Sequence, residues 1–224
     1  MKVFVGYDTR EDITYQVCEY SILKHCPDAQ VIPLIQKDLR DAGLYTRPVD
    51  NLGSTEFTFT RFLVPFLSNY QGLSVFVDCD FVFTESVGKL FEEADPDRAV
   101  MVAKHEYAPK ESLKMDGKRQ FPYPRKNWSS MIVWNCGHPS NRQLDLKTVN
   151  EETGQYLHRF QWLQDDEIGK LSHEWNWLVN WYKEPEDGSP KALHYTEGGP
   201  WFKDYRHCEY SEVWKKYLKE MLEQ

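Results

Sequence analysis

Residues 74–83 read SVFVDCDFVF, an apolar run that two aspartates interrupt, Asp78 and Asp80. A short apolar run of this kind is typical of a buried strand. Side chains alternate across an extended chain, so we expect both carboxylates to point the same way from the end of the strand. Two adjacent carboxylates repel unless a cation lies between them, and oxygen ligands favour Mg²⁺ or Mn²⁺. The alternative is that both acids are solvated or cap a turn.

Outward from this run, predicted strands and helices alternate. Apolar runs at 3–7 and 31–35 predict strands, and between them apolar residues recur at helical spacing from Ile13 to Leu23. Strand, helix, strand in this order is typical of a parallel sheet. Further strands are expected at 75–77, 99–103, 131–134 and 192–195, helices at 57–67, 143–160, 165–174 and 211–224, and loops at 37–56 and 106–128. In the last helix, Ser211 is the expected N-cap.

These elements predict an α/β fold with a mixed, mainly parallel central sheet flanked by helices. At 224 residues the chain has the length of one domain, so we expect a single domain over 1–224 with a helical tail at 203–224.

Composition and charge exclude several classes of protein. The formal net charge is −8, which argues against nucleic acid as a partner, because that binding relies on neutralising phosphates. The five cysteines are odd in number and form no CxxC pair, which indicates a reducing compartment. The sequence shows neither a signal peptide nor an apolar run of the roughly 18 residues that a membrane span needs. We therefore expect a cytoplasmic protein, with membrane contact only at its periphery.

Five segments, in this order, resemble family 8 retaining glycosyltransferases, which include bacterial lipopolysaccharide galactosyl- and glucosyltransferases and glycogenin. They are VFVGYDTREDITYQVCEYSIL, TFTRFLVPFL, WSSMIVWN, QDDEIGKLSHEWNWL and LHYTEGGPWF, and together they run from about residue 3 to 202. The resemblance implies a GT-A type nucleotide-diphospho-sugar transferase fold. It also implies transfer of a hexose from a nucleotide-sugar, with a UDP-sugar as the expected donor, to a glycan, lipid-linked or protein acceptor with retention of configuration.

The resemblance also assigns roles to residues. Asp78, Asp80 and His194 would bind the metal, and an imidazole ligand favours Mn²⁺ over Ca²⁺. Asp8 would read the uracil ring with Tyr7 beside it, and Arg61 would contact the donor sugar or the metal-binding acids. The residues expected to bind the donor are Tyr7, Asp8, Arg61, Cys79, Ser129, Gly198, Gly199 and Trp201.

The chemical problem is that a glycosyl–diphosphate bond breaks with negative charge on the leaving group, which a metal bridging both phosphates neutralises. Retention needs either a carboxylate on the opposite face of the sugar or front-side attack. The family's usual residue near that face is Gln, and in this chain Asp166 stands there, next to Asp165. We therefore interpret Asp166, Asp165 and Arg61 as catalytic. The alternative is that both aspartates merely begin a helix.

The chain departs from the family at two positions. Gly199 replaces a Lys that holds the diphosphate, and Ser129 and Ser130 replace an Asn-Ala or Asn-Ser pair beside the donor sugar. Trp201 is interpreted either as packing under a sugar or as pinning its loop to the core. The missing charge could come from the metal alone or from one of five cations: Lys104, Lys118, Arg119, Arg125 or Lys126.

Two alternatives for the function remain open. The chain could bind a nucleotide-sugar without catalysis, or it could be a metal-dependent phosphohydrolase that uses the DCD pair. Separately, the lysines of the C-terminal helix, Lys215, Lys216 and Lys219, suit approach to a lipid-linked acceptor, whereas the apolar face of the helix suits packing on its own domain.

Overall fold

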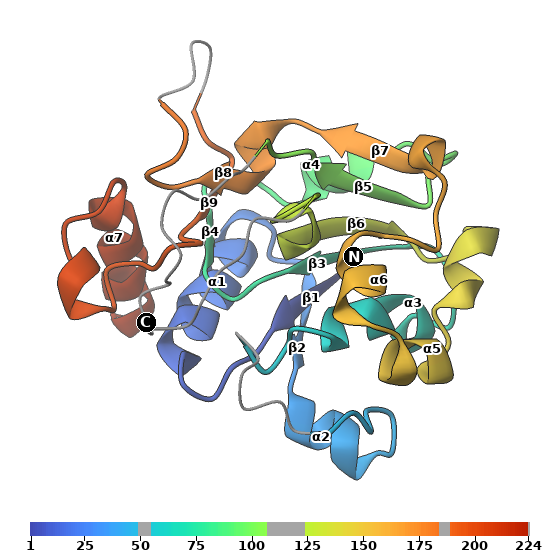
Figure 1. Ribbon diagram of the computed structural model, residues 1–224. Coiled ribbons are helices and arrows are strands. Elements are labelled where there is room, and N and C mark those ends of the chain that lie inside the picture. The colour runs from blue at the N-terminus through green and yellow to red at the C-terminus, as the bar shows by residue number, and fades with distance from the viewer. Residues whose placement is uncertain (49–54, 107–123, 184–188, 224) are drawn as a thin grey trace.

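A central six-stranded sheet organises the computed structural model, which describes residues 1–48, 55–106, 124–183 and 189–223 (Figure 1). The strand order is β2-β1-β3-β6-β5-β7. Strand β6 runs antiparallel to its neighbours β3 and β5, and the other pairs are parallel. The expected mixed, mainly parallel sheet is therefore confirmed. Its strands are β1 (Lys2–Gly6), β2 (Gln30–Leu34), β3 (Leu73–Val77), β5 (Val100–Ala103), β6 (Met131–Asn135) and β7 (Ile168–Leu171).

A second, three-stranded sheet has the order β4-β9-β8. Its strands are β4 (Phe81–Phe83), β8 (Trp177–Leu178) and β9 (Ala192–His194). The chain passes from the first sheet to the second within the turn 78–80. The prediction that Asp78 and Asp80 share one face of a single extended strand was therefore wrong, because the chain turns between them.

Helices cover both faces of the central sheet (Figure 1). The part of the chain that the structure describes has α1 (Asp12–His25), α2 (Gln36–Asp41), α3 (Val64–Leu67), α4 (Gly88–Glu92), α5 (Leu146–Glu151), α6 (Gly154–His158) and α7 (Ser211–Leu222). Helix α1 agrees with the prediction, whereas α2 falls in a segment expected to be a loop.

Three predicted helices differ from the structure. The segment 57–67 forms a 3₁₀ helix, Thr60–Leu63, followed by the short α3. The segment 143–160 is divided because the hydroxyl of Thr153 accepts a hydrogen bond from Tyr156 N at 3.1 Å and so starts a new helix, α6. The segment 165–174 forms a single 3₁₀ turn and then β7, whose Ile168 and Leu171 are buried.

Helix α7 packs its apolar face against its own domain. Its Tyr217 lies edge-on to Tyr20 of α1, and the hydroxyl of Tyr217 is 2.7 Å from His25 Nε2. A salt bridge joins Lys24 to Glu220. The expected N-cap, Ser211, is instead the first residue of the helix. The N-cap position is Tyr210, which has a left-handed conformation and makes no side-chain cap hydrogen bond. Over the described ranges, none of the helices has the length and apolar character needed to cross a membrane.

Candidate active site

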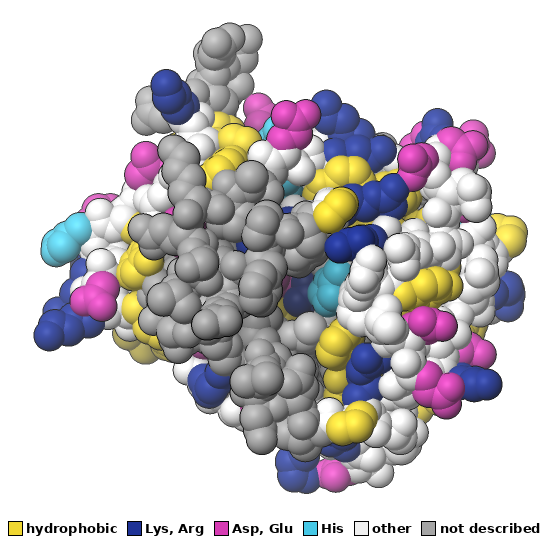
Figure 2. All heavy atoms as spheres, viewed as in Figure 1, with side chains coloured by type: hydrophobic (Ala, Val, Ile, Leu, Met, Phe, Trp, Pro, Cys, Tyr) yellow, Lys and Arg dark blue, Asp and Glu magenta, His cyan; other side chains and the backbone are white. Residues whose placement is uncertain are grey.

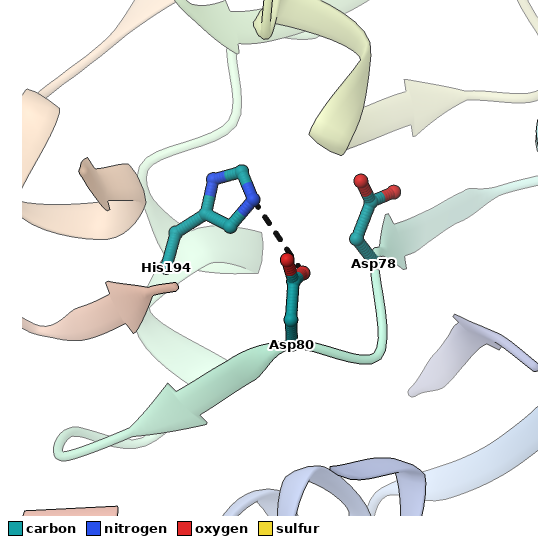
Figure 3. Close-up of side chains that lie close together, drawn as sticks. All are labelled: Asp78, Asp80 and His194. Atoms are coloured by element: carbon teal, nitrogen blue, oxygen red, sulfur yellow. Dashed lines mark ion pairs between the residues drawn. The ribbon is translucent and has the colours of Figure 1, made fainter. Parts of the chain in front are cut away.

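Two strand ends and a turn bring Asp78, Asp80 and His194 together (Figure 3). Asp78 directly follows β3, Asp80 directly precedes β4, and His194 is the last residue of β9. The antiparallel pairing of β4 with β9 sets Phe81 opposite His194, so the imidazole lies beside the turn. One ligand atom from each of the three side chains lies within 4.8 Å of the other two. His194 Nε2 is 3.5 Å from Asp80 Oδ1.

The orientation of His194 is fixed by a buried amide. Asn176 Nδ2 donates to Ser130 Oγ at 2.9 Å, and Ser130 Oγ donates to the carbonyl of Asn127 at 2.7 Å. Asn176 Oδ1 is therefore the atom that faces His194 Nδ1, at 2.9 Å. An amide oxygen only accepts, so Nδ1 carries the proton and Nε2 presents its lone pair toward the aspartates. Metal-binding histidines are usually oriented in this way.

The donor set fits a divalent cation. Two carboxylates and one imidazole nitrogen are ligands that Mn²⁺ and Mg²⁺ accept. The ring of Phe81 stacks on His194 with centroids 4.3 Å apart and keeps the imidazole in place. Asp78, Asp80 and His194 are the three residues that would hold the metal.

Arg61 ties the turn at Asp78 to the segment that precedes β6. Its Nη1 lies 2.7 Å from Asp78 Oδ1 and also donates to the carbonyl of Ser129 at 2.7 Å. Its Nε donates to the carbonyl of Thr58 at 3.1 Å, and its guanidinium packs over the ring of Phe76. Of the two contacts expected for Arg61, the structure has the one to an acid of the candidate metal site, Asp78.

A cleft of about 730 Å³, open solvent included, surrounds these residues. On the face shown in Figure 2, a hollow lies beside the atoms drawn in grey, with histidine and basic side chains at its border. The described residues that line the cleft are Glu11, Thr55, Phe57, Arg61, Asp78, Cys79, Asp80, Asn127, His194, Tyr195, Thr196, Glu197, Gly198, Trp201 and Phe202.

Tyr7 and Asp8 follow β1, next to the cleft rather than among its lining residues. Asp8 is fully buried, and it accepts hydrogen bonds from Arg10 Nε at 2.9 Å and from the backbone N–H of Glu56 at 3.1 Å. Burial acts to raise the pKa of Asp8, but the bonds from Arg10 and Glu56 outweigh it and leave that pKa below its ordinary value. The Tyr7 hydroxyl donates to Asp12 at 2.8 Å.

Backbone conformation and steric contact explain why residues 198 and 199 are both glycines. Gly198 has φ +121°, which other residues rarely adopt. A Cβ on Gly199 would lie 2.0 Å from the ring of Trp201, so a lysine cannot stand there without displacing that ring. Trp201 packs against Tyr195 and Trp214, with centroids 5.9 and 5.5 Å apart, which supports the interpretation that it pins its loop to the core.

Comparison with known proteins identifies relatives in sequence and in structure. The chain matches no family model. It is 49% identical over 223 residues to Protein CDI of Arabidopsis thaliana, a match that covers 98% of this chain and 86% of that protein. The chain belongs to the family of Protein CDI.

Solved structures show the same fold at low identity. The chain superposes on the galactosyltransferase LgtC, solved with donor and acceptor sugar analogues, with a TM-score of 0.59 and 14% identity, over 98% of this chain and 96% of LgtC. The glycosyltransferase GlyE of Streptococcus pneumoniae TIGR4 gives 0.64 and 15%, over 99% of this chain and 62% of GlyE. The bifunctional glycosyltransferase WbbM gives 0.68 and 14%, over 100% and 51%. The fold is therefore that of GT-A glycosyltransferases, and this chain spans only part of GlyE and WbbM.

Sequence reasoning missed three residues that this arrangement uses. Asn176 lies in the segment QDDEIGKLSHEWNWL, but the sequence does not indicate its hydrogen bond to His194. Asn127 belongs to a segment expected to be a loop. The third is His158, whose Nδ1 lies 2.8 Å from Ser129 Oγ. Burial, followed by the charges of Arg61 and Arg47, lowers the pKa of His158 to about 3, so this imidazole is neutral near pH 7.

The structure does not bring Asp165 and Asp166 to the cleft. They precede β7, which runs parallel to β5, so they lie at the edge of the sheet opposite to the carboxyl ends of β1, β3 and β5. Both are exposed, and Asp165 pairs with Arg125 at 2.5 Å. Neither is among the described lining residues.

The candidate cations for the diphosphate differ in their surroundings. Lys104 Nζ donates to the carbonyl of Ile168 at 2.7 Å, and burial lowers the pKa of this lysine. Arg125 is engaged by Asp165 and by the carbonyl of Arg159. Lys126 is buried, and it directly precedes Asn127 in the sequence. Lys118 and Arg119 lie outside the described residues.

Proposed function

We propose that this chain is a metal-dependent glycosyltransferase that moves a hexose from a nucleotide-sugar, with a UDP-sugar as donor, to a glycan, lipid-linked or protein acceptor. The observation that carries the proposal is the Asp78–Asp80–His194 group at the carboxyl edge of a GT-A sheet. In open α/β sheets, ligands bind outside the carboxyl ends of the strands. The shared fold with the glycosyltransferases GlyE, WbbM and LgtC gives further support.

In this function the residues around the candidate metal site would bind the diphosphate part of the donor. A bound divalent ion would supply neutralisation of the charge that develops on the departing diphosphate. Arg61 holds Asp78, and Asn176 holds His194, so that the ligand atoms converge before the ion arrives. The turn at Gly198 brings backbone close to the same place, which suits a diphosphate.

Asp8 and Tyr7 are proposed to bind the base. An ionised Asp8 can accept the imide N–H of uracil, and its lowered pKa keeps it ionised at neutral pH. The Arg10 side chain forms a salt bridge with this carboxylate and is itself 51% exposed. It therefore has to swing aside, or bond the base as well, when the nucleotide enters.

Retention of configuration is proposed with front-side attack, in which the acceptor hydroxyl approaches on the face that the diphosphate leaves. The placement of Asp165 and Asp166 away from the cleft favours this route over attack by either carboxylate. A catalytic role for these two residues stays a prediction from the sequence.

Thermal unfolding with UDP, UDP-glucose and UDP-galactose, each with Mn²⁺ or with chelator, tests the proposal. A ligand at a hundredfold excess over its dissociation constant stabilises by about 2.7 kcal/mol, so a clear shift is expected with metal and none with chelator. Asp80→Ala should abolish the shift, and Asp97→Ala, which removes an exposed acid outside the cleft, should keep it. Absence of any shift in the wild-type protein would refute the proposal.

The two alternatives are separated by product analysis. A binding protein would take up the UDP-sugar and release no UDP on long incubation with metal. A phosphohydrolase would release phosphate from p-nitrophenyl phosphate and would not require His194.

A further inference from the structure

Basic side chains gather beside the cleft of a protein whose formal net charge is −8. In Figure 2 they lie over the region that β5, β6 and β7 occupy in Figure 1. We call three of them the basic patch: Lys104, which follows β5, Arg125, which precedes β6, and Lys170 of β7. Burial lowers the pKa of Lys104, and the nearby charges of Arg125 and Lys170 lower it further. Like charges gathered in this way repel one another, so the basic patch suits an anion.

An indole ring lies against two cations of the basic patch. Lys104 Nζ is 5.7 Å and the guanidinium carbon of Arg125 is 5.4 Å from the ring centroid of Trp128. The ring is only partly buried, and its Nε1 donates to the carbonyl of His105 at 3.1 Å. Trp128 directly follows Asn127, which lines the cleft. The basic patch therefore begins at the border of the cleft.

A carboxylate of the chain itself pairs with the basic patch. Arg125 Nη2 lies 2.5 Å from Asp165 Oδ1, and its Nη1 donates to the carbonyl of Arg159 at 2.7 Å. The side chain of Asp165 is 89% exposed, and ion pairs with so exposed a partner contribute little to stability. The carboxylate of a ligand can therefore displace Asp165 and pair with the same guanidinium, whose flat fork matches a carboxylate.

The order of the strands places the basic patch on the side of the cleft that the donor leaves open. Along the sheet the strands run β1, β3, β6, β5, β7. The base is proposed to lie at Asp8 after β1, and the candidate metal site begins at Asp78 after β3. The basic patch lies beyond β3, on β6, β5 and β7. A donor that extends from β1 to β3 leaves this side to the acceptor.

We propose that the basic patch binds an acceptor glycan that carries carboxylate groups, a uronate, an inference that rests on the proposed function. Arg125 pairs with one carboxylate where Asp165 now lies. Lys104 and Lys170 add positive charge, and the ring of Trp128 packs against the apolar face of a sugar ring. Anionic membranes and nucleic acids fit less well. A basic segment that binds such membranes typically has about four to eight Lys or Arg, and nucleic-acid binding neutralises many phosphates.

Calorimetry with trigalacturonate and with its fully methyl-esterified form tests the inference, because the esters keep the sugar rings and remove the charges. In about 50 mM salt, which screens weakly, we expect wild type to bind the methyl ester about tenfold more weakly than trigalacturonate. Arg125→Gln should weaken trigalacturonate binding about five- to tenfold. Asp165→Asn removes the competing carboxylate and should strengthen it about two- to fivefold, a change of opposite sign that structural damage does not produce.

The matched control is Arg142→Gln, which should bind trigalacturonate like wild type. Arg142 is exposed and also packs over an aromatic ring, that of Tyr70, with its guanidinium carbon 5.6 Å from the centroid. It follows β6, whereas Arg125 precedes that strand, so it lies at the other edge of the sheet.

Three results would overturn the inference. Equal binding of trigalacturonate and its methyl ester would mean that the charge is not recognised. A parallel loss of UDP binding in Mn²⁺ by Arg125→Gln would assign this cation to the diphosphate. Binding of glucose 6-phosphate through Arg125, without binding of trigalacturonate, would make the ligand a phosphate. The proposed function fails separately, if wild type binds neither UDP nor any UDP-sugar, because trigalacturonate is titrated without nucleotide or metal.

Discussion

Replacement of Asn176 by alanine should weaken metal binding more than any loss of stability accounts for. The change removes the acceptor of His194 Nδ1–H and the donor to Ser130 Oγ, two bonds of 2.9 Å in a fully buried place. Loss of a group that orients a metal ligand typically lowers metal affinity 10- to 100-fold, or about 1.4–2.8 kcal/mol. The buried Nδ1–H of His194 left without an acceptor, together with the hydrogen bond lost at Ser130 Oγ, should also lower the free energy of unfolding by roughly 2–4 kcal/mol.

A second buried asparagine separates these two effects. Asn141 is also fully buried, and its Nδ2 donates to the carbonyls of Ala99 and Asn135 at 2.8 Å, away from the cleft. Asn141→Ala should lose comparable stability and keep its Mn²⁺ affinity. Mn²⁺ affinity is measured by calorimetry well below the unfolding temperature, and stability by urea titration. The reasoning is refuted if Asn176→Ala binds Mn²⁺ like wild type, or if both variants lose affinity equally.

Two further predictions concern Gly199 and His158. Gly199→Ala should lower the melting temperature and abolish nucleotide binding, because its Cβ would lie 2.0 Å from Trp201, whereas Gly137→Ala, with contacts no closer than 3.7 Å, should do neither in thermal scans. His158 has a folded pKa of about 3 against an ordinary 6.5, so the unfolded state binds the proton first as pH falls. This histidine's contribution to stability is therefore complete above pH 6.5 and is lost toward pH 3, by up to about 1.4 kcal/mol per pH unit. Urea titrations at pH 7, 6 and 5 should show a smaller pH dependence for His158→Gln than for wild type, and an identical dependence would contradict the pKa.

The central sheet could be predicted because local signals and burial agree there. The apolar runs at 3–7, 75–77 and 131–134 are strands that are covered on both faces, and such strands have nearly continuous apolar sequences. The segment 165–174 failed for the opposite reason. Acidic residues followed by mixed polar and apolar ones are compatible with a helix, and only the pairing of Ile168 with Val100 makes this segment an edge strand.

The grouping of Asp78, Asp80 and His194 was expected from the sequence, but for a partly wrong reason. Asp78 and Asp80 converge because the chain turns between two sheets, and not because they alternate along one strand. The contribution of Asn176 could not be predicted, since its partners lie 46 and 18 residues away in the sequence. The position of the Asn127 side chain depends on a left-handed backbone conformation that no local sequence pattern indicated.

The turn between β3 and β4 limits the insertions and deletions that this region can tolerate. Asp78 closes one sheet, Asp80 opens the other, and the single residue between them, Cys79, is buried. The length of this connection therefore sets the relative position of the two sheets as well as the distance between two candidate metal ligands. An insertion or deletion here would shift β4 along β9 and carry Asp80 away from His194, so metal binding and the joining of the two sheets depend on one shared spacing.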